Sequence, residues 1–183
     1  MIGIFLFCIN MKVSDLKEGD FHPFYGPYID TLGDPDLLEM LKRQKGNFPE
    51  FIASIPDELW HSAYEEGKWT IAEVLVHILD AERVFQYRAL RIGRGDTTPL
   101  PGFDQDAYVP ASGAAQRSKE EIIEEYRIVR ASTISLYSQF SEEDLRLKGV
   151  ASNSPTSVGA LGFIICGHQK HHRNIIRSRY LNN

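Results

Sequence analysis

Three of the six histidines of this chain lie within five residues near its C-terminus, in Gly167-His168-Gln169-Lys170-His171-His172. His168 and His172 are four residues apart, so that on a helix they project from the same face. Two imidazoles one turn apart on an apolar face need an electron-poor group between them, and a divalent cation suits such a pair. The spacing therefore predicts a metal site on a C-terminal helix.

A third ligand is expected from a different helix, and the segment from Glu73 to Asp80 offers His77. On a helical projection, His77 stands where the apolar stripe of this segment meets a polar flank, which suits a crevice in a helical bundle. One such histidine is more often a hydrogen-bonded core residue, but together with His168 and His172 it favours a shared cation. Three imidazole ligands leave positions open for water or substrate, which is typical of catalytic metal sites.

The other polar residues near these histidines have two interpretations each. Asp80 or Glu73 could orient His77 by accepting its second N–H or act as a catalytic base, and either is equally a solvated charge on the helix. Arg88 falls on the His77 face, where it would receive an anionic substrate group or extend to solvent. His171 lies at the edge of the His168 face, where it is the weaker candidate for a ligand and equally could support one or be half-exposed. Two further candidates for a base, which no spacing argument selects, are Asp104 and Asp106.

Four amphipathic stretches of about twenty residues must position these side chains. The predicted helices cover residues 34–55, 70–92, 118–140 and 157–180. The first begins at a cap formed by Asp34-Pro35 and is expected to break near Gly46-Asn47. Thr70 and Ser118, each followed three residues later by glutamate, match capping boxes that begin the second and third helices. No alternating run indicates a sheet.

The segments between the helices are expected to be loops. Residues 93–117 hold four glycines and three prolines, which predicts a long loop between the second and third helices, and residues 149–155 are also predicted as loop. Four helices with one long connection describe an all-α four-helix bundle.

Composition bounds the remaining classes of function. The chain has 183 residues, enough for one domain, and a net charge of −5 with no basic run, which disfavours nucleic-acid binding. Its two cysteines, Cys8 and Cys166, cannot form a disulfide framework, so a reducing cytoplasm is expected. Cys166 is expected to fill core space. The apolar start, residues 2–9, is too short to span a membrane and lacks the features of a targeting signal.

The N-terminal region is predicted to lie outside the bundle. Residues 1–33 are expected to form an extension that is at most partly ordered. Residues 34–183 are expected to form the bundle domain. Met11 is an equally good initiator, so the first ten residues are interpreted as an upstream extension outside the fold, or else as an apolar tail that packs on a partner surface.

Two motifs of the chain are similar to those of a known family. The segment from Trp69 to Glu82, the Gly167–His172 segment and the closing Arg179-Tyr180-Leu181 resemble the DinB/YfiT superfamily of bacterial four-helix bundles over about residues 34–182. The resemblance implies a divalent metal, most often zinc or nickel. The family's ligands map onto His77, His168 and His172. The resemblance also implies a homodimer. Characterised members of the family include bacillithiol- or mycothiol-dependent transferases and a mycothiol-dependent maleylpyruvate isomerase.

The residues and the resemblance lead to one leading hypothesis and three alternatives. The leading hypothesis is a metal-dependent enzyme that activates a low-molecular-weight thiol for transfer to a small electrophile. The first alternative is a hydrolase that uses metal-bound hydroxide, since the same open position serves either nucleophile. The others are a non-catalytic, stress-related metal-binding bundle and a plain bundle with hydrogen-bonded core histidines. In each enzymatic version the substrate is a small molecule, and neither nucleic acid nor a membrane is a partner.

Overall fold

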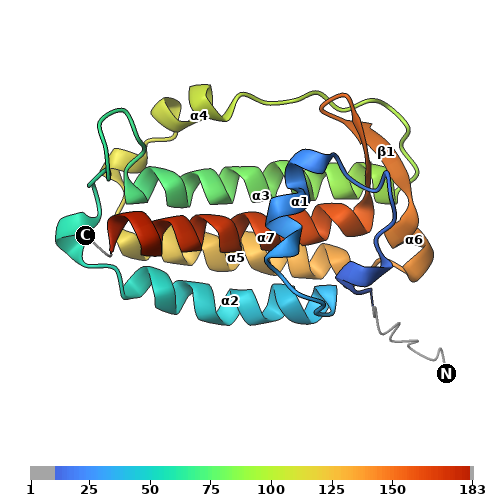
Figure 1. The fold of residues 1–183 in the computed structure, drawn as a ribbon, viewed down its shortest axis with the longest axis horizontal. Helices are drawn as coiled ribbons and strands as arrows, with labels where there is room; N and C mark the ends of the chain where they lie inside the picture. The colour runs from blue at the N-terminus through green and yellow to red at the C-terminus, as the bar shows by residue number, and fades with distance from the viewer. Residues whose placement is uncertain (1–10, 182–183) are drawn as a thin grey trace.

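Four long helices form the body of the molecule in a computed structural model that describes residues 11–181 (Figure 1). They are α2 (Leu37–Ala53), α3 (Ile71–Gly93), α5 (Lys119–Tyr137) and α7 (Val158–Ile175). Helix α3 packs on both α7 and α5, and α2 packs on α5 and α7. The predicted all-α four-helix bundle is confirmed.

The long connection follows from the direction of the helices. In Figure 1, α3 and α5 run the same way along the bundle, so the chain has to return its full length between them. Residues 94–118 make this return across α3, as predicted. The expectation that the whole connection is loop is wrong, because α4 (Gln105–Ala111) lies within it. The side chain of Asp104 caps α4 by accepting from the backbone N–H groups of Asp106 and Ala107.

Reciprocal capping boxes begin α3 and α5, as the sequence predicts. The hydroxyl of Thr70 accepts from the N–H of Glu73, while the Glu73 carboxylate accepts from the N–H of Thr70 at 2.7 Å. Ser118 and Glu121 repeat this arrangement, with a carboxylate distance of 2.8 Å. Each box satisfies N–H groups that have no partner inside the helix.

Helix α2 departs from the prediction at two points. Its cap is Asp36, which accepts from the N–H of Glu39 at 2.9 Å, whereas Asp34 accepts a hydrogen bond from the N-terminal segment. The expected break near Gly46-Asn47 is absent, and the helix is continuous. One glycine in a helix costs only about 1 kcal/mol, which the buried apolar face of α2 offsets.

A short antiparallel hairpin replaces the loop predicted at residues 149–155. Strands β1 (Lys148–Ala151) and β2 (Ser154–Ser157) pair with Ala151 opposite Ser154. The turn residues Ser152 and Asn153 both have positive φ, of 52° and 61°, as a two-residue hairpin turn of type I′ requires. Strands of four residues are too short to show a reliable alternation, which is why the sequence pattern missed them.

The N-terminal segment packs against the bundle. Helix α1 (Gly26–Asp30) lies across α7 (Figure 1), and Met11 is buried, with its carbonyl accepting from the N–H of Leu37. Close contact with α7 depends on Gly167, because a Cβ built there would lie 2.5 Å from the backbone oxygen of Tyr28. Residues 11–33 therefore cover one side of α7.

The predicted division between an extension and a bundle domain at residue 34 stays a prediction. Its first part, residues 1–10 with Cys8, lies outside the described residues. Cys166 is buried as expected, and burial raises the pKa of its thiol to about 12. The thiol is therefore protonated near neutral pH and acts as a small apolar side chain.

A buried ion pair ties the helices together at mid-height. Arg130 of α5 donates from Nε and Nη2 to the two carboxylate oxygens of Glu82 on α3, at 2.7 and 2.8 Å, and the two residues are 0% and 2% exposed. Arg130 also donates to the side chain of Gln44 on α2, which itself donates to the carbonyl of Cys166 on α7. Thr133 supplies one more hydrogen bond to Glu82. One polar network thus connects all four long helices.

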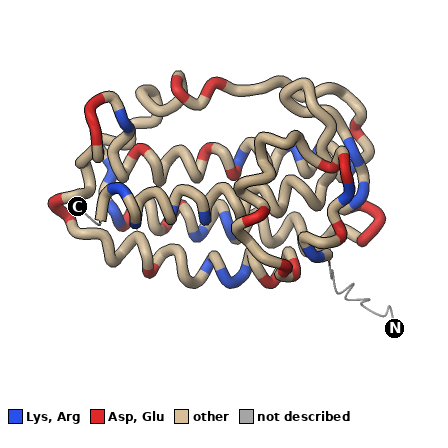
Figure 2. Tube along the Cα trace, in the orientation of Figure 1, with Lys and Arg blue, Asp and Glu red and all other residues tan. Residues whose placement is uncertain are grey.

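Charged residues of both signs are distributed over the rest of the molecule, as Figure 2 shows. The ends of the bundle and the loops carry both acidic and basic positions. Within residues 11–181, no helix combines the length and the apolar character needed to cross a lipid bilayer.

Replacing Arg130 with methionine should lower the free energy of unfolding by about 3–5 kcal/mol, because the Glu82 carboxylate would stay buried without its partner. The double variant Glu82→Met/Arg130→Met should recover most of this loss, and Arg127→Met, on the exposed side of α5, should change stability by less than about 0.5 kcal/mol. Chemical denaturation measures all three. Equal effects of Arg130→Met and Arg127→Met would contradict the role given to the network.

Gly167→Ala should destabilise the protein by about 1–3 kcal/mol, because the added Cβ would meet the backbone of Tyr28 and push α1 away from α7. Gly46→Ala is the matched control, since a Cβ at this position of α2 meets nothing within 4 Å. It should be neutral or stabilising by up to about 1 kcal/mol. If both substitutions behave alike in denaturation experiments, residues 26–30 do not pack as described.

Candidate metal site

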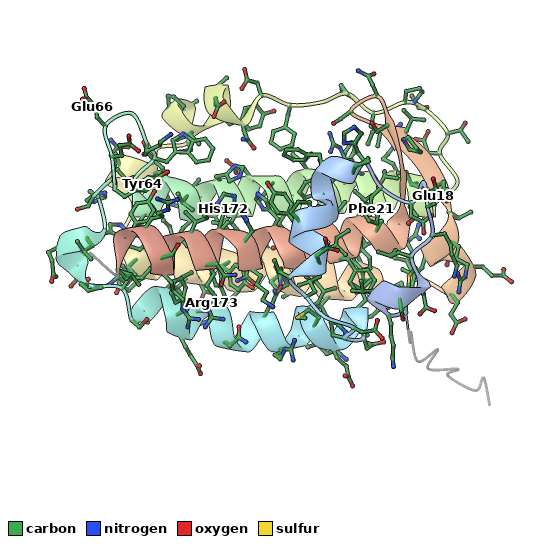
Figure 3. The ribbon with its side chains drawn as sticks, in the orientation of Figure 1. Glu18, Phe21, Tyr64, Glu66, His172 and Arg173 are labelled. Carbon is green, nitrogen blue, oxygen red and sulfur yellow. The ribbon has the colours of Figure 1, made fainter. Side chains whose placement is uncertain are left out.

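Helices α3 and α7 bring three imidazoles together. His77 lies in the first half of α3, and His168 and His172 lie one turn apart on the face of α7 that packs against it. Figure 3 shows His172 in the space between these two helices. The ring centroid of His77 lies 4.8 Å from that of His168 and 5.0 Å from that of His172. The convergence of the three rings expected from the sequence is therefore present.

The nitrogen atoms of the cluster have the spacing of a ligand set. The Nε2 atom of His168 lies 3.0 Å from that of His77 and 3.1 Å from that of His172. All three possible ligand atoms lie within 4.8 Å of one another. With zinc–nitrogen bonds of about 2.0–2.1 Å, two tetrahedral ligands stand about 3.3 Å apart. The donor set therefore fits one divalent ion with little movement.

Hydrogen bonding alone satisfies this cluster poorly. A neutral imidazole Nε2 either donates one proton or accepts through one lone pair, and the Nε2 of His168 faces two others at hydrogen-bond distance. It can serve only one of them well. A cation shared by three lone pairs removes this conflict, which makes a metal ion the better physical explanation of the arrangement.

Burial keeps the three imidazoles neutral. His77 and His168 are only 4% and 7% exposed, and His172 is partly buried. Burial lowers the pKa of His77 to about 4 and that of His172 to about 3, and it lowers the pKa of His168 well below the ordinary 6.5. The neighbouring imidazoles lower the pKa values of His168 and His172 further. All three rings are therefore deprotonated near pH 7, the form that binds metal.

Aromatic rings enclose the cluster on several sides. Trp69 lies with its ring centroid 4.9 Å from that of His77, and Phe85 lies 6.2 Å from His168. Tyr28 of α1 contacts His168 at 5.7 Å. These rings hold the imidazoles in place and exclude water from their flanks.

A cavity of about 130 Å³ opens directly onto two of the histidines. Its wall is formed by α1, α3, the connection and the hairpin turn, and it is mainly aromatic. The lining residues are Phe24, Tyr25, Tyr28, His77, Ala81, Phe85, Phe103, Gln105, Ser152 and His168. A small apolar molecule could reach the histidine cluster from this cavity.

A second, wider cavity of about 250 Å³ is lined by Trp69 but by none of the three clustered histidines. Trp69, which contacts His77, forms part of its wall, and its other groups are more polar. The lining residues are Tyr64, Gly67, Lys68, Trp69, Val74, Asp106, Ile175 and Tyr180. Only the first cavity therefore opens directly onto the histidines, and Trp69 stands between His77 and the second.

The structure places the carboxylates proposed as a base in different surroundings. Glu73 is engaged in the capping box with Thr70. Asp80 lies beside Arg83, at 3.7 Å, on the side of α3 that faces α5. These partners are Thr70 and Arg83, not the clustered imidazoles. A catalytic role for Glu73 or Asp80 stays a prediction.

The two candidate carboxylates of the connection, Asp104 and Asp106, also have different surroundings. Asp104 is used as the cap of α4. Asp106 lies close enough for its charge to raise the pKa of His77, against the larger lowering by burial, and it lines the second cavity. Of the four acidic candidates, Asp106 is therefore the one that the structure associates with both the histidine cluster and a cavity.

Arg88 is buried behind the first cavity. It donates to the carbonyl of Pro101 and the hydroxyl of Ser152, at 2.8 and 2.9 Å, and its guanidinium lies over the rings of Phe85 and Phe103. These contacts join α3 to the connection and the hairpin turn. The predicted role in binding an anionic substrate stays a prediction, and the contacts present make Arg88 a support for the cavity wall.

His171 stands next to the cluster without joining it. Its ring lies 4.8 Å from Tyr28 and 5.1 Å from His172, and it is half-buried. The group of three that could hold an ion does not include it. This placement agrees with its expected position at the edge of the ligand face.

Sequence reasoning missed the contribution of the N-terminal segment. Tyr25 and Tyr28 line the first cavity, although they lie in a region interpreted as an extension. Two signals were available: the aromatic run from Phe24 to Tyr28, and Gly167 beside His168, which allows another backbone to approach.

The metal-free protein should lose stability as the pH falls from 6.5 towards 4. In the unfolded chain the histidines titrate near 6.5, whereas in the folded chain His77 takes up its proton only near pH 4. The unfolded state therefore binds more protons in this window, and the free energy of unfolding decreases as the pH falls through it. Thermal denaturation with a chelator, between pH 8 and 4, measures the effect.

His172→Gln removes one of these buried titrating groups and should make the pH dependence shallower. His61→Gln is the matched control, because His61 is exposed and should leave the slope as in the wild type. A His172→Gln variant with the wild-type slope would show that burial of these imidazoles does not control the acid sensitivity.

One curated relative shares most of the chain. A protein of Oceanobacillus iheyensis named "Putative metal-dependent hydrolase" is 25% identical over 152 residues, which cover 81% of this chain and 86% of the relative. The name describes that protein.

Solved structures share the fold at low sequence identity. YfiT from Bacillus subtilis, described as "a probable metal-dependent hydrolase with an unusual four-helix bundle topology", matches with a TM-score of 0.64 at 14% identity, over 88% of this chain and 89% of YfiT. A mycothiol-dependent maleylpyruvate isomerase matches with a TM-score of 0.64 at 9% identity. The match covers 90% of this chain and 62% of the isomerase, so the isomerase is substantially longer.

A family model agrees with the histidine motifs and with the bundle. The model of the DinB superfamily matches residues 40–176, which include all three clustered histidines. This chain therefore belongs to the DinB superfamily.

Proposed function

We propose that this protein is a metal-dependent enzyme that transfers a small thiol to an electrophilic small molecule. The observation that carries the proposal is the cluster of His77, His168 and His172, in which three neutral imidazoles face one point beside a cavity. A divalent ion held there would lower the pKa of a thiol or water molecule that it binds and so supply a nucleophile near neutral pH.

The residues around the cluster define what each side would bind. The aromatic cavity against His77 and His168 suits a small apolar electrophile, because it offers ring surfaces and few charged groups. The second cavity suits the polar part of a thiol cosubstrate, since Lys68, Asp106, Tyr64 and Tyr180 line it. The thiol group would have to reach past Trp69 to the histidines, since only the first cavity opens onto them.

Asp106 is the best placed group to accept a proton from the incoming thiol. It lines the cavity assigned to the thiol, and its charge acts on His77. Because it is exposed, it can exchange the proton with solvent after each turnover. Tyr28 and Trp69 keep bulk water away from the imidazoles and thereby limit competing hydrolysis.

Hydrolysis by metal-bound hydroxide is the second candidate. It is favoured by the names of the Oceanobacillus iheyensis relative and of YfiT, both of which refer to metal-dependent hydrolases. The mycothiol-dependent isomerase supports the thiol version in the same way. We further propose zinc or nickel as the ion, since imidazole suits both, and a homodimer in the cytoplasm as the working state.

Thiol transfer predicts product formation that requires both a thiol and the metal site. Untagged, zinc-loaded protein would be incubated with an aryl halide, 1-chloro-2,4-dinitrobenzene, and in turn with cysteine, glutathione, bacillithiol and mycothiol. The rate, followed by absorbance, should saturate with at least one thiol and fall to the uncatalysed rate in His168→Ala. His61→Ala, outside the cluster, should keep the wild-type rate.

The same protein would be tested on aryl and alkyl esters without thiol. Hydrolysis that depends on His168 and needs no thiol would replace the transferase by the hydrolase. If metal-loaded protein accelerates neither class of reaction, the enzymatic proposal is wrong and the non-catalytic bundle stands.

A further inference from the structure

A basic groove lies between α2 and α7, on a different side of α7 from the histidine cluster. Its volume is about 330 Å³. The lining residues are Met40, Arg43, Gln44, Asn47, Gln169, Lys170, Arg173, Asn174 and Arg177. Figure 2 shows basic positions on both helices. The groove shares no lining residue with either of the cavities beside the cluster.

The four cations of this groove have no acidic partner. Among residues 11–181, no ion pair involves Arg43, Lys170, Arg173 or Arg177. Lys170 donates to the carbonyl of Thr31, and Arg43 only contacts the sulfur of Met40. By contrast, a carboxylate pairs with each of Arg83, Arg91, Arg117, Arg127 and Arg130. Four like charges around one hollow repel one another unless an anion lies between them.

Arg173 and Arg177 are held in place by an aromatic ring. Their guanidinium groups lie 5.0 and 5.3 Å from the centre of the Phe51 ring. This contact orders two long side chains one turn apart, so that little further entropy is lost when they bind a ligand. The two charges are therefore pre-positioned along the groove.

Buried polar atoms of the groove lack hydrogen-bond partners. Gln169 is 1% exposed, and its side-chain oxygen has no partner; the Nε–H of Arg173 is also buried and unpartnered. Leaving such a group unsatisfied costs about 1–3 kcal/mol. A half-turn of the Gln169 amide would present its NH₂ group, so both residues can donate to an anion in the groove.

We propose that the groove between α2 and α7 binds a small phosphorylated molecule that carries two phosphoryl groups. Lys170 lies on α7 and Arg177 in the π-helical turn Ile176–Tyr180 that continues it, seven residues later, which corresponds to about 10 Å along the axis. Arg43 lines the same groove from α2. One phosphoryl group cannot reach both ends of this row, whereas two can. Arginine forks and amide N–H groups match phosphate oxygens in geometry and charge.

The experiment is isothermal titration calorimetry of untagged, zinc-loaded protein with fructose 1,6-bisphosphate and, separately, with inorganic phosphate. The bisphosphate should bind in a saturable way and at least about tenfold more tightly than phosphate, because it engages both ends of the groove. Equal affinity for the two probes would overturn the assignment of two phosphoryl groups, and absence of saturable binding would overturn the site.

Matched charge variants locate the binding. Arg43→Gln/Arg177→Gln removes two exposed cations of the groove and should weaken bisphosphate binding by at least about tenfold. Lys45→Gln/Arg127→Gln removes the same charge at exposed positions outside it and should change affinity by less than about twofold. Equal losses in the two double variants would mean that the anion binds through net charge alone.

Titration of His168→Ala separates this site from the proposed metal centre. The variant should bind the bisphosphate as the wild type does, because His168 does not line the groove. Loss of binding in this variant would place the anion at the histidine cluster and overturn the inference. The outcome does not depend on whether the protein catalyses thiol transfer.

Discussion

A buried ion pair between Glu82 and Arg130 is the centre of the polar network that links the helices carrying the histidines. Through Gln44, this network reaches the backbone of Cys166, two residues before His168, and Glu82 itself lies five residues after His77 on α3. A buried charge pair tolerates little displacement, because each lost hydrogen bond leaves a buried charged group with neither a partner nor water to replace it. The network therefore links α3 to α7 through α5 and α2 close to the histidines, and the direct packing of α3 on α7 brings the three rings together.

Three imidazoles are then held in a space where they have few other partners. Burial and the aromatic shell of Tyr28, Trp69 and Phe85 keep the rings neutral and fix their orientation. Removing three polar rings from water is unfavourable unless they gain an interaction of comparable strength. Coordination of a divalent ion by His77, His168 and His172 would supply it, and the cavity at His77 and His168 would give a small molecule access to that ion.

Helical periodicity, capping boxes and the spacing of His168 and His172 were sufficient to predict the bundle and the clustered histidines. These signals are local, since each depends on residues within one or two turns of a helix. The hairpin and α4 were missed because short elements carry little periodicity. The aromatic wall from Tyr25 and Tyr28 was missed because it depends on how a distant segment packs against Gly167, and neither the aromatic run nor the glycine alone specifies that contact. The surroundings of Asp80 likewise include Glu125 of α5 and Arg117 of the connection, which the pattern of its own helix does not predict.

The most direct test of the metal centre is X-ray absorption at the zinc edge of untagged, zinc-loaded protein. We expect three imidazole nitrogens at about 2.0–2.1 Å and at least one further light ligand from solvent, with one imidazole fewer, or no bound zinc, in His168→Ala. A fourth protein ligand would indicate a closed structural site. A coordination shell without imidazole, or one unchanged by His168→Ala, would contradict the central claim that these three histidines bind one ion.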